Sequence, residues 1–195
     1  MFEIRIHGRG GQGVVSAAEM LSVAAFFEDR HAQAFPSFGS ERMGAPVMAF
    51  CRIADRTIRL REPVVSPDAL IIQDPTLLHQ VPLFSGLGKE GFILVNSKRS
   101  FAELGLAEFV ADFRPDHCLT VPASELALEY AGRPLPNAAL LGGFCAATGL
   151  LKLESVLRAI EEKFPGPVGE RNAKAAQAAY DFVRVQKEVP LVSAN

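Results

Sequence analysis

The chain has 195 residues, of which 49% are apolar, and this is enough to bury one substantial core. Its 20 basic and 22 acidic residues give a formal net charge of -2 without a basic run, so no nucleic-acid partner is expected. A single cytoplasmic domain over residues 1–195 is predicted, because neither a signal peptide nor a membrane-spanning apolar stretch is recognisable.

The most informative feature is a glycine-rich turn near the amino terminus. A short apolar run, Phe2 to His7, predicts a strand, and residues 14–27 predict an alanine-rich helix. Glycines permit positive φ and a close backbone approach to a ligand, while the open N–H groups of a helix N-terminus favour an anion. The candidate phosphate- or carboxylate-binding residues are therefore Gly8, Arg9, Gly10, Gly11, Gln12 and Gly13.

Two other interpretations of this turn remain open. The spacing Gly8-x-Gly10-x-x-Gly13 matches the dinucleotide-binding pattern, but Glu28-Asp29 is a poor substitute for the acidic residue expected after a second strand. The glycines also fit a tight strand-to-helix turn with close packing and no ligand. A P-loop is not expected, because no Lys-Ser/Thr follows the glycines.

Residues 34–46 contain prolines and glycines that preclude a regular element, so a loop is predicted there. This loop concentrates hydroxyl, carboxylate and guanidinium groups. They either flank an active site at a subunit interface or form structural ion pairs. The residues concerned are Ser37, Ser40, Glu41 and Arg42. Residues 47–53 and 57–60 are then expected to form two strands of a small hairpin at the edge of a sheet.

Three short, nearly continuous apolar runs follow at residues 69–73, 92–96 and 118–121, and such runs are typical of buried parallel strands. The predicted fold class is α/β, with a three-layer Rossmann-like sheet that is mostly parallel, an antiparallel edge hairpin and a helical C-terminal part. The carboxyl ends of parallel strands meet at one edge. Gln73-Asp74 and Asn96-Ser97-Lys98 are therefore expected near the glycine turn.

The C-terminal part predicts helices over residues 138–148, 153–164 and 171–183, followed by a tail over 184–195. Small residues in the first of these helices favour close packing against another helix. Cys51, Cys118 and Cys145 are widely separated, which predicts buried reduced thiols and no iron–sulfur cluster in this chain. The histidines are equally scattered, so no metal site is expected.

Together these residues resemble a known family. The motifs are Ile4 to Gly13, the loop from Phe35 to Pro46, and the pieces Asn137…Leu141-Gly142 and Asn172-Ala173. They are similar to the gamma subunit of 2-oxoacid:ferredoxin (acceptor) oxidoreductases over essentially the whole chain. The combination of the glycine turn with the Ser-x-Gly-x-Glu-x-x-Gly loop carries this resemblance.

The resemblance implies a subunit of an enzyme that oxidatively decarboxylates a 2-oxoacid to an acyl-CoA, and pyruvate, a branched-chain acid and an aryl 2-oxoacid all remain open as the substrate. Alpha and beta subunits would hold the substrate, thiamine diphosphate and Mg, and a ferredoxin-like delta subunit would hold [4Fe-4S] clusters that pass electrons to ferredoxin or another acceptor. By the same resemblance, the glycine turn would face coenzyme A. Neither Glu41 nor any histidine is expected to act as a catalytic base, and no catalytic residue is assigned to this chain.

Two further classes of function remain as alternatives: a stand-alone Rossmann-like nucleotide-binding enzyme, and a nucleotide sensor without turnover. A stand-alone enzyme would be active as the isolated 21.0 kDa chain, whereas a gamma-type subunit would be inactive without its partners.

Overall fold

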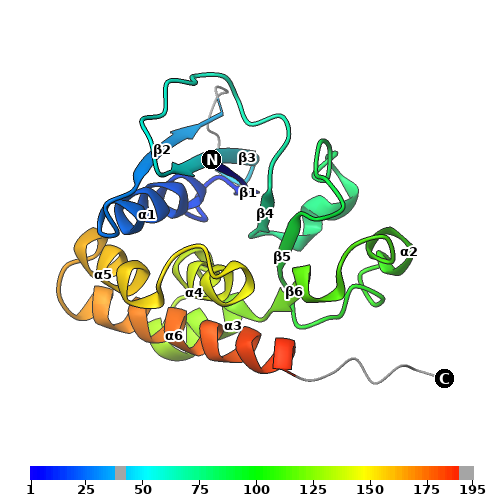
Figure 1. Cartoon of the computed structure of the whole chain (residues 1–195). Helices are drawn as coiled ribbons and strands as arrows, with labels where there is room; N and C mark the ends of the chain where they lie inside the picture. Colours follow the sequence, from blue (N-terminus) through cyan, green and yellow to red (C-terminus); the bar gives the residue numbers. More distant parts are fainter. Residues whose placement is uncertain (38–42, 189–195) are drawn as a thin grey trace.

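The structure, a computed structural model, describes residues 1–37 and 43–188. At its centre is a six-stranded mixed sheet in the order β2-β3-β1-β4-β5-β6 (Figure 1). Strands β1, β4, β5 and β6 are parallel, whereas β3 pairs antiparallel with both β1 and β2. The strands are β1 (Phe2–Arg9), β2 (His31–Pro36), β3 (Pro46–Ala54), β4 (Ala69–Ile72), β5 (Phe92–Asn96) and β6 (Cys118–Val121). The predicted α/β class, with a mostly parallel sheet and an antiparallel edge, is confirmed.

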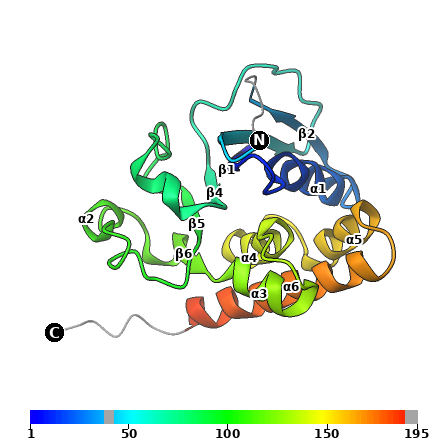
Figure 2. The same cartoon turned by 180° about the vertical axis from the view of Figure 1, so that it is seen from behind.

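Long helices cover one face of the sheet. They are α1 (Val14–Phe26), α3 (Ala123–Ala131), α4 (Asn137–Thr148), α5 (Leu153–Lys163) and α6 (Pro167–Glu188). Figures 1 and 2 show α1 and α4 against the strands, with α6 packed along α4 on the side away from them. Together they enclose the larger apolar core. Within residues 1–37 and 43–188, no helix combines the length and apolarity needed to cross a lipid bilayer.

The opposite face of the sheet has a smaller apolar cluster and is covered by short turns and loops. Here Leu77 and Leu83 pack with Ile72, Ile93 and Val95 of the strands. The covering segments are the 3-10 turns η1 (Pro75–His79) and η2 (Pro115–His117), the short helix α2 (Ala107–Val110) and the loops between them. The first element after β4 is therefore the short 3-10 turn η1, which lies beside the end of β1, where Arg9 donates to Thr76.

The antiparallel edge differs from the expectation in its second strand. Residues 31–36 form β2, although residues 34–36 were expected in a loop, and Phe35 packs on Phe50 of β3 at 5.1 Å between ring centroids. The strand predicted at residues 57–60 does not form. Both edges of β3 are already paired, one with β1 and one with β2, so no edge of β3 is left for a hairpin partner.

The last helix is longer than expected. It begins at Pro167, a favoured residue for a first helical position, and continues to Glu188, into the segment predicted as a tail. Lys187 supports this end by donating to the carbonyl oxygens of Ala146 and Ala147 at 3.3 and 2.8 Å. Residues 189–195 of the predicted tail lie outside the described residues.

Close packing of α4 on α6 depends on Gly142. A Cβ added there would overlap the carbonyl oxygen of Ala176 in the backbone of α6. The expected effect of Gly142→Ala is a loss of about 1–3 kcal/mol in the free energy of unfolding, measured by urea titration, because the helices must separate. Gly143→Ala in the same helix is the control.

At Gly143 an added Cβ would meet the side chains of Val183, Leu94 and Val121, at 3.4, 3.5 and 3.6 Å. Alanine is also the better helix former, so this variant should be neutral or stabilised by up to about 1 kcal/mol. Equal losses in the two variants would contradict the helix contact at Gly142.

Candidate functional site

The glycine turn joins β1 to α1 within four residues. Gly11 and Gly13 have φ values of +91° and +73°, in the left-handed region that favours glycine. Gly13 also packs closely, because an added Cβ would overlap the side-chain amide of Asn137 at the start of α4. It precedes α1 directly and offers no side chain to cap the first helical amides. Backbone conformation and close packing therefore both require glycine here.

The main-chain amides of the turn divide into two groups. The amide of Arg9 donates to Oε1 of Gln12 at 2.8 Å, and that of Gly10 donates to the carbonyl of Ala45 at 2.9 Å. The amides of Gly11, Gly13 and the first helical residues 14–16 have no hydrogen-bond acceptor within the described part of the chain. These open donors lie at the positive end of the α1 dipole, where an anion is favoured.

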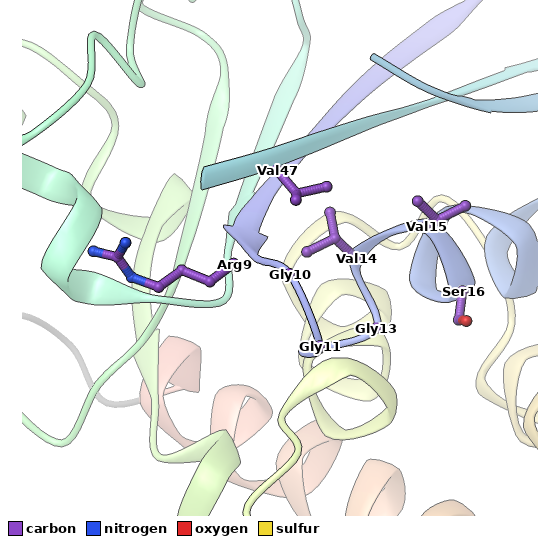
Figure 3. A pocket seen from close by; sticks show the side chains of 8 residues that line it. All are labelled: Arg9, Gly10, Gly11, Gly13, Val14, Val15, Ser16 and Val47. Carbon is purple, nitrogen blue, oxygen red and sulfur yellow. The ribbon is translucent and has the colours of Figure 1, made fainter. Parts of the chain in front are cut away.

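A hollow of about 390 Å³ adjoins the open amides (Figure 3). Figure 3 shows Val14 of α1 and Val47 of β3 facing one another. The hollow therefore combines an apolar wall with main-chain donors, and Ser16 adds a hydroxyl group. It is lined by Arg9, Gly10, Gly11, Gly13, Val14, Val15, Ser16 and Val47.

The side chain of Arg9 points away from Gly11 and Gly13, toward η1 (Figure 3). Its Nη2 donates to Oγ1 of Thr76 at 2.7 Å and to Oε1 of Gln80 at 2.8 Å. Nη1 donates to the carbonyl of Gly44 at 3.1 Å, and Nε lies 3.2 Å from Oδ2 of Asp74. The guanidinium charge is thus held beside the Asp74 carboxylate.

Asp74 follows β4, and its side chain connects that strand to the turn. Oδ2 accepts from Nε2 of Gln12 at 2.8 Å, while Oδ1 accepts from the amide and hydroxyl of Thr76 at 3.0 and 2.6 Å. Burial opposes ionisation, but the hydrogen bonds from Thr76 and Gln12 and the charge of Arg9 outweigh it, so the pKa of Asp74 is lowered. The carboxyl ends of β1 and β4 meet as the sequence predicts.

The second motif reaches the turn through its last residues. Gly44 donates its amide to the carbonyl of Gly10 at 3.1 Å, and Met43 pairs with Gly10 as an isolated bridge. Ser37 continues from β2 and donates its amide to the carbonyl of Met48 at 2.8 Å. Ser40, Glu41 and Arg42 lie outside the described residues. The described end of this motif is therefore attached to the glycine turn.

A family model described as pyruvate ferredoxin/flavodoxin oxidoreductase matches residues 3–182. The pyruvate/ketoisovalerate oxidoreductases common subunit gamma of Pyrococcus furiosus is 45% identical over 185 residues, which cover 95% of this chain and 98% of that subunit. The chain belongs to the pyruvate ferredoxin/flavodoxin oxidoreductase family. The match along nearly the whole of both chains makes it a gamma-type subunit, and the resemblance inferred from its sequence is confirmed.

Solved structures agree with this assignment to the oxidoreductase family. The crystal structure of pyruvate oxidoreductase subunit PORC from Thermotoga maritima has 37% identity and a TM-score of 0.76, and covers 92% of this chain and 95% of that chain. A 2-oxoglutarate:ferredoxin oxidoreductase from Magnetococcus marinus shares the fold at 16% identity with a TM-score of 0.69. The match covers 95% of this chain but 31% of that one, and that structure holds 2-oxoglutarate, coenzyme A and succinyl-CoA.

Sequence reasoning did not identify the two residues of this gamma-type subunit that hold the Arg9 guanidinium, Thr76 and Gln80. A local signal for Thr76 was present, because Asp74-Pro75-Thr76 has a capping residue and a proline at a helix start. Gln73 is 1% exposed, and both polar atoms of its side chain lack a hydrogen-bond partner in the part of the chain described. Its main-chain carbonyl accepts from Nδ2 of Asn96 at 2.9 Å.

Burial disfavours the thiolate form of the cysteines in this family member. Cys51 and Cys145 are buried free thiols, and burial raises the pKa of each to about 12. Cys118 is half-buried, and burial raises its pKa to about 11. No group of three or more His, Cys, Asp or Glu side chains suited to a metal ion occurs within residues 1–37 and 43–188.

A buried basic pair supports the strand that leads into the turn. Arg5 is 6% exposed and donates from Nη2 to the carbonyls of Leu83 and Ser85 at 2.7 and 2.6 Å. Its Nε donates to Nε2 of His7 at 3.0 Å, so that nitrogen must be unprotonated. Burial, and then the charge of Arg5, lower the pKa of His7 to about 3.

The depressed pKa of His7 makes stability depend on pH. Between its ordinary value of 6.5 and about 3, the unfolded chain binds one proton more than the folded chain at this position. The free energy of unfolding should therefore fall by up to about 1.4 kcal/mol per pH unit as the pH drops through this range. Urea titrations at pH 7, 6 and 5 would measure the slope, and His7→Gln should flatten it. An identical slope in the variant would contradict this role of His7.

Proposed function

We propose that this gamma-type subunit contributes the coenzyme A site of a complex that oxidatively decarboxylates a 2-oxoacid to an acyl-CoA. The amides at Gly11, Gly13 and the start of α1 would bind the pyrophosphate of the coenzyme. Pyruvate or a branched-chain 2-oxoacid is the proposed substrate, in keeping with the name of the Pyrococcus furiosus relative. The complex would also contain alpha, beta and ferredoxin-like delta subunits, with ferredoxin as electron acceptor.

One observation carries this proposal. At a helix N-terminus the turn has main-chain donors without an acceptor among the described residues, and its two left-handed glycines allow a ligand to approach the backbone. Several N–H groups can share the charge of a pyrophosphate without a competing side chain. Gly8, Gly10 and Gln12 would act by shaping the turn. Arg9 would act mainly through its link to η1, since its guanidinium is already held there.

The hollow beside the turn suits the rest of such a ligand. Its apolar wall, formed by Val14, Val15 and Val47, can contact the methyl-bearing arm of coenzyme A while the amides hold the phosphates. The Magnetococcus marinus enzyme, which shares this fold, has coenzyme A bound. This supports a coenzyme role for the enzyme class, and the turn supplies the matching chemistry in this chain.

A dinucleotide role is less well supported. Binding of a ribose needs a free carboxylate near the end of the neighbouring strand, and Asp74 holds that place after β4. Both its oxygens already accept hydrogen bonds, from Gln12 and from Thr76. The Asp74 carboxylate is thus already engaged in hydrogen bonds within the protein.

In this proposal the chain binds coenzyme A and shapes its site, while partner subunits carry the cofactors. Thiamine diphosphate with Mg on the partners would supply the carbanion chemistry, and [4Fe-4S] clusters would carry the electrons. This chain would orient the coenzyme and exclude water beside it. Ser37, Ser40, Glu41 and Arg42 are proposed to lie at the interface with those partners, and a cytoplasmic location fits the three free thiols.

Gly11→Val tests the coenzyme site in the assembled complex. A β-branched residue is strained at a φ of +91°, so the turn must change shape, whereas the nearest atom to the new side chain is the flexible end of Met43. The apparent KM for coenzyme A should rise by ~10-fold or more. Reduction of the electron acceptor by the 2-oxoacid in a single turnover without coenzyme A should stay unchanged.

Gly166→Val is the matched control, because Gly166 has a φ of +72°, has no atom within 4 Å of an added Cβ, and lies between α5 and α6. It imposes a similar backbone strain away from the turn and should leave the KM for coenzyme A as it is. If Gly11→Val assembles normally and its KM for coenzyme A equals that of the control, the coenzyme assignment is wrong.

A further inference from the structure

Five side chains connect the glycine turn to η1. We call them the brace: Arg9, Gln12, Asp74, Thr76 and Gln80. We propose that Asp74 is a positioning residue which, through Gln12 and Arg9, holds the turn in the conformation that leaves the amides of Gly11 and Gly13 open. This inference rests on the proposed coenzyme A site, and it gives the brace a role in that site without contact with the coenzyme.

The first link passes through Gln12, which stands between the two left-handed glycines. Its Oε1 accepts from the amide of Arg9 at 2.8 Å, and its Nε2 donates to Asp74 at 2.8 Å. Its own main-chain amide donates to the carbonyl of Arg9 at 3.0 Å. Both ends of one side-chain amide are thereby held, and so is the peptide plane between Gly11 and Gln12, which carries the Gln12 amide. This plane lies between the open amides of Gly11 and Gly13.

The second link passes through Arg9. Its guanidinium joins Thr76, Gln80 and the carbonyl of Gly44, and its Nε lies 3.2 Å from Asp74. The side chains of Arg9 and Asp74 are 24% and 12% exposed, so the pair is shielded from much of the solvent. One charged pair thus holds together the end of β1, the start of η1 and Gly44, the last residue of the second motif.

Only a carboxylate can satisfy all the donors that surround position 74. Two donors of Thr76 face Oδ1, and the donors of Gln12 and Arg9 face Oδ2. Asparagine would replace one acceptor oxygen by an NH₂ group, which must then face another donor. Asp74→Asn should therefore release either the Thr76 side or the Gln12 and Arg9 side of the brace.

The experiment measures amide exchange in the turn and the kinetics with coenzyme A separately, both in the assembled complex. Hydrogen exchange by mass spectrometry follows the hydrogen-bonded amides of Arg9, Gly10 and Gln12, and steady-state kinetics give kcat and the KM for coenzyme A. In Asp74→Asn, exchange in the turn should accelerate by about tenfold and the KM should rise by a similar factor. The kcat at saturating coenzyme A should stay within about twofold, because the brace does not touch the reacting atoms.

A second pair of variants distinguishes loss of the brace from general unfolding of the chain. Thr76 is exposed, and Thr76→Val removes the hydroxyl that bonds Asp74 and Arg9 while keeping the shape. It should also accelerate exchange in the turn, whereas Thr76→Ser, which keeps the hydroxyl, should restore it. Asp112→Asn is the matched control, since Asp112 pairs with Lys89 at 3.0 Å on the surface and has no part in the brace.

Unchanged exchange in the turn of both Asp74→Asn and Thr76→Val would overturn the positioning role. So would an unchanged KM in Asp74→Asn if Gly11→Val raises it, because the turn would then work without the brace. The proposed function fails on a different result, an unchanged KM in Gly11→Val. In that case accelerated exchange in Asp74→Asn would still support the brace as the device that holds the turn.

Discussion

The hydrogen bond between Gln12 and Asp74 is the interaction on which the carboxyl end of the sheet depends. The chain must leave β1, reverse through two left-handed glycines and enter α1 within four residues. Such a turn is usually held by its own main-chain hydrogen bonds. Here side chains supply much of the constraint, through Gln12 and Arg9, and within the described residues this leaves main-chain donors without an acceptor. Rigidity of the turn and availability of its amides therefore come from the same arrangement.

The unequal covering of the two faces of the sheet makes this arrangement possible. Long helices bury one face, and the close contact of α4 with α6 at Gly142 lets them form a compact double layer. The other face is covered by η1, η2, α2 and loops. A long helix after β4 would carry the chain away from the turn, whereas η1 places Thr76 and Gln80 directly beside the end of β1. The buried Arg5 ties the segment after η1 to the same strand through Leu83 and Ser85.

Much of the fold was predictable from sequence because its parallel strands β4, β5 and β6 are almost wholly buried. Residues 92–96 and 118–121 form strands with the predicted bounds, since continuous apolar runs have few alternatives in a chain of this size. The antiparallel edge was less predictable. β2 gains its stability from pairing with β3 and from the contact of Phe35 with Phe50, and neither is visible in local composition. The strand expected at residues 57–60 does not form, because both edges of β3 are already paired.

At the site, sequence spacing located the glycine turn but could not predict where the Arg9 side chain points. Its partners Thr76 and Gln80 lie 67 and 71 residues away in the chain, so their proximity is a product of topology. A basic residue within a glycine turn suggests a ligand for its charge, yet a guanidinium with several donors goes to whichever acceptors the fold brings near it. Here Asp74 neutralises it. The anion that this turn is proposed to bind would then meet neutral amides and a helix dipole, so its recognition would rest on the shape of the backbone more than on net charge.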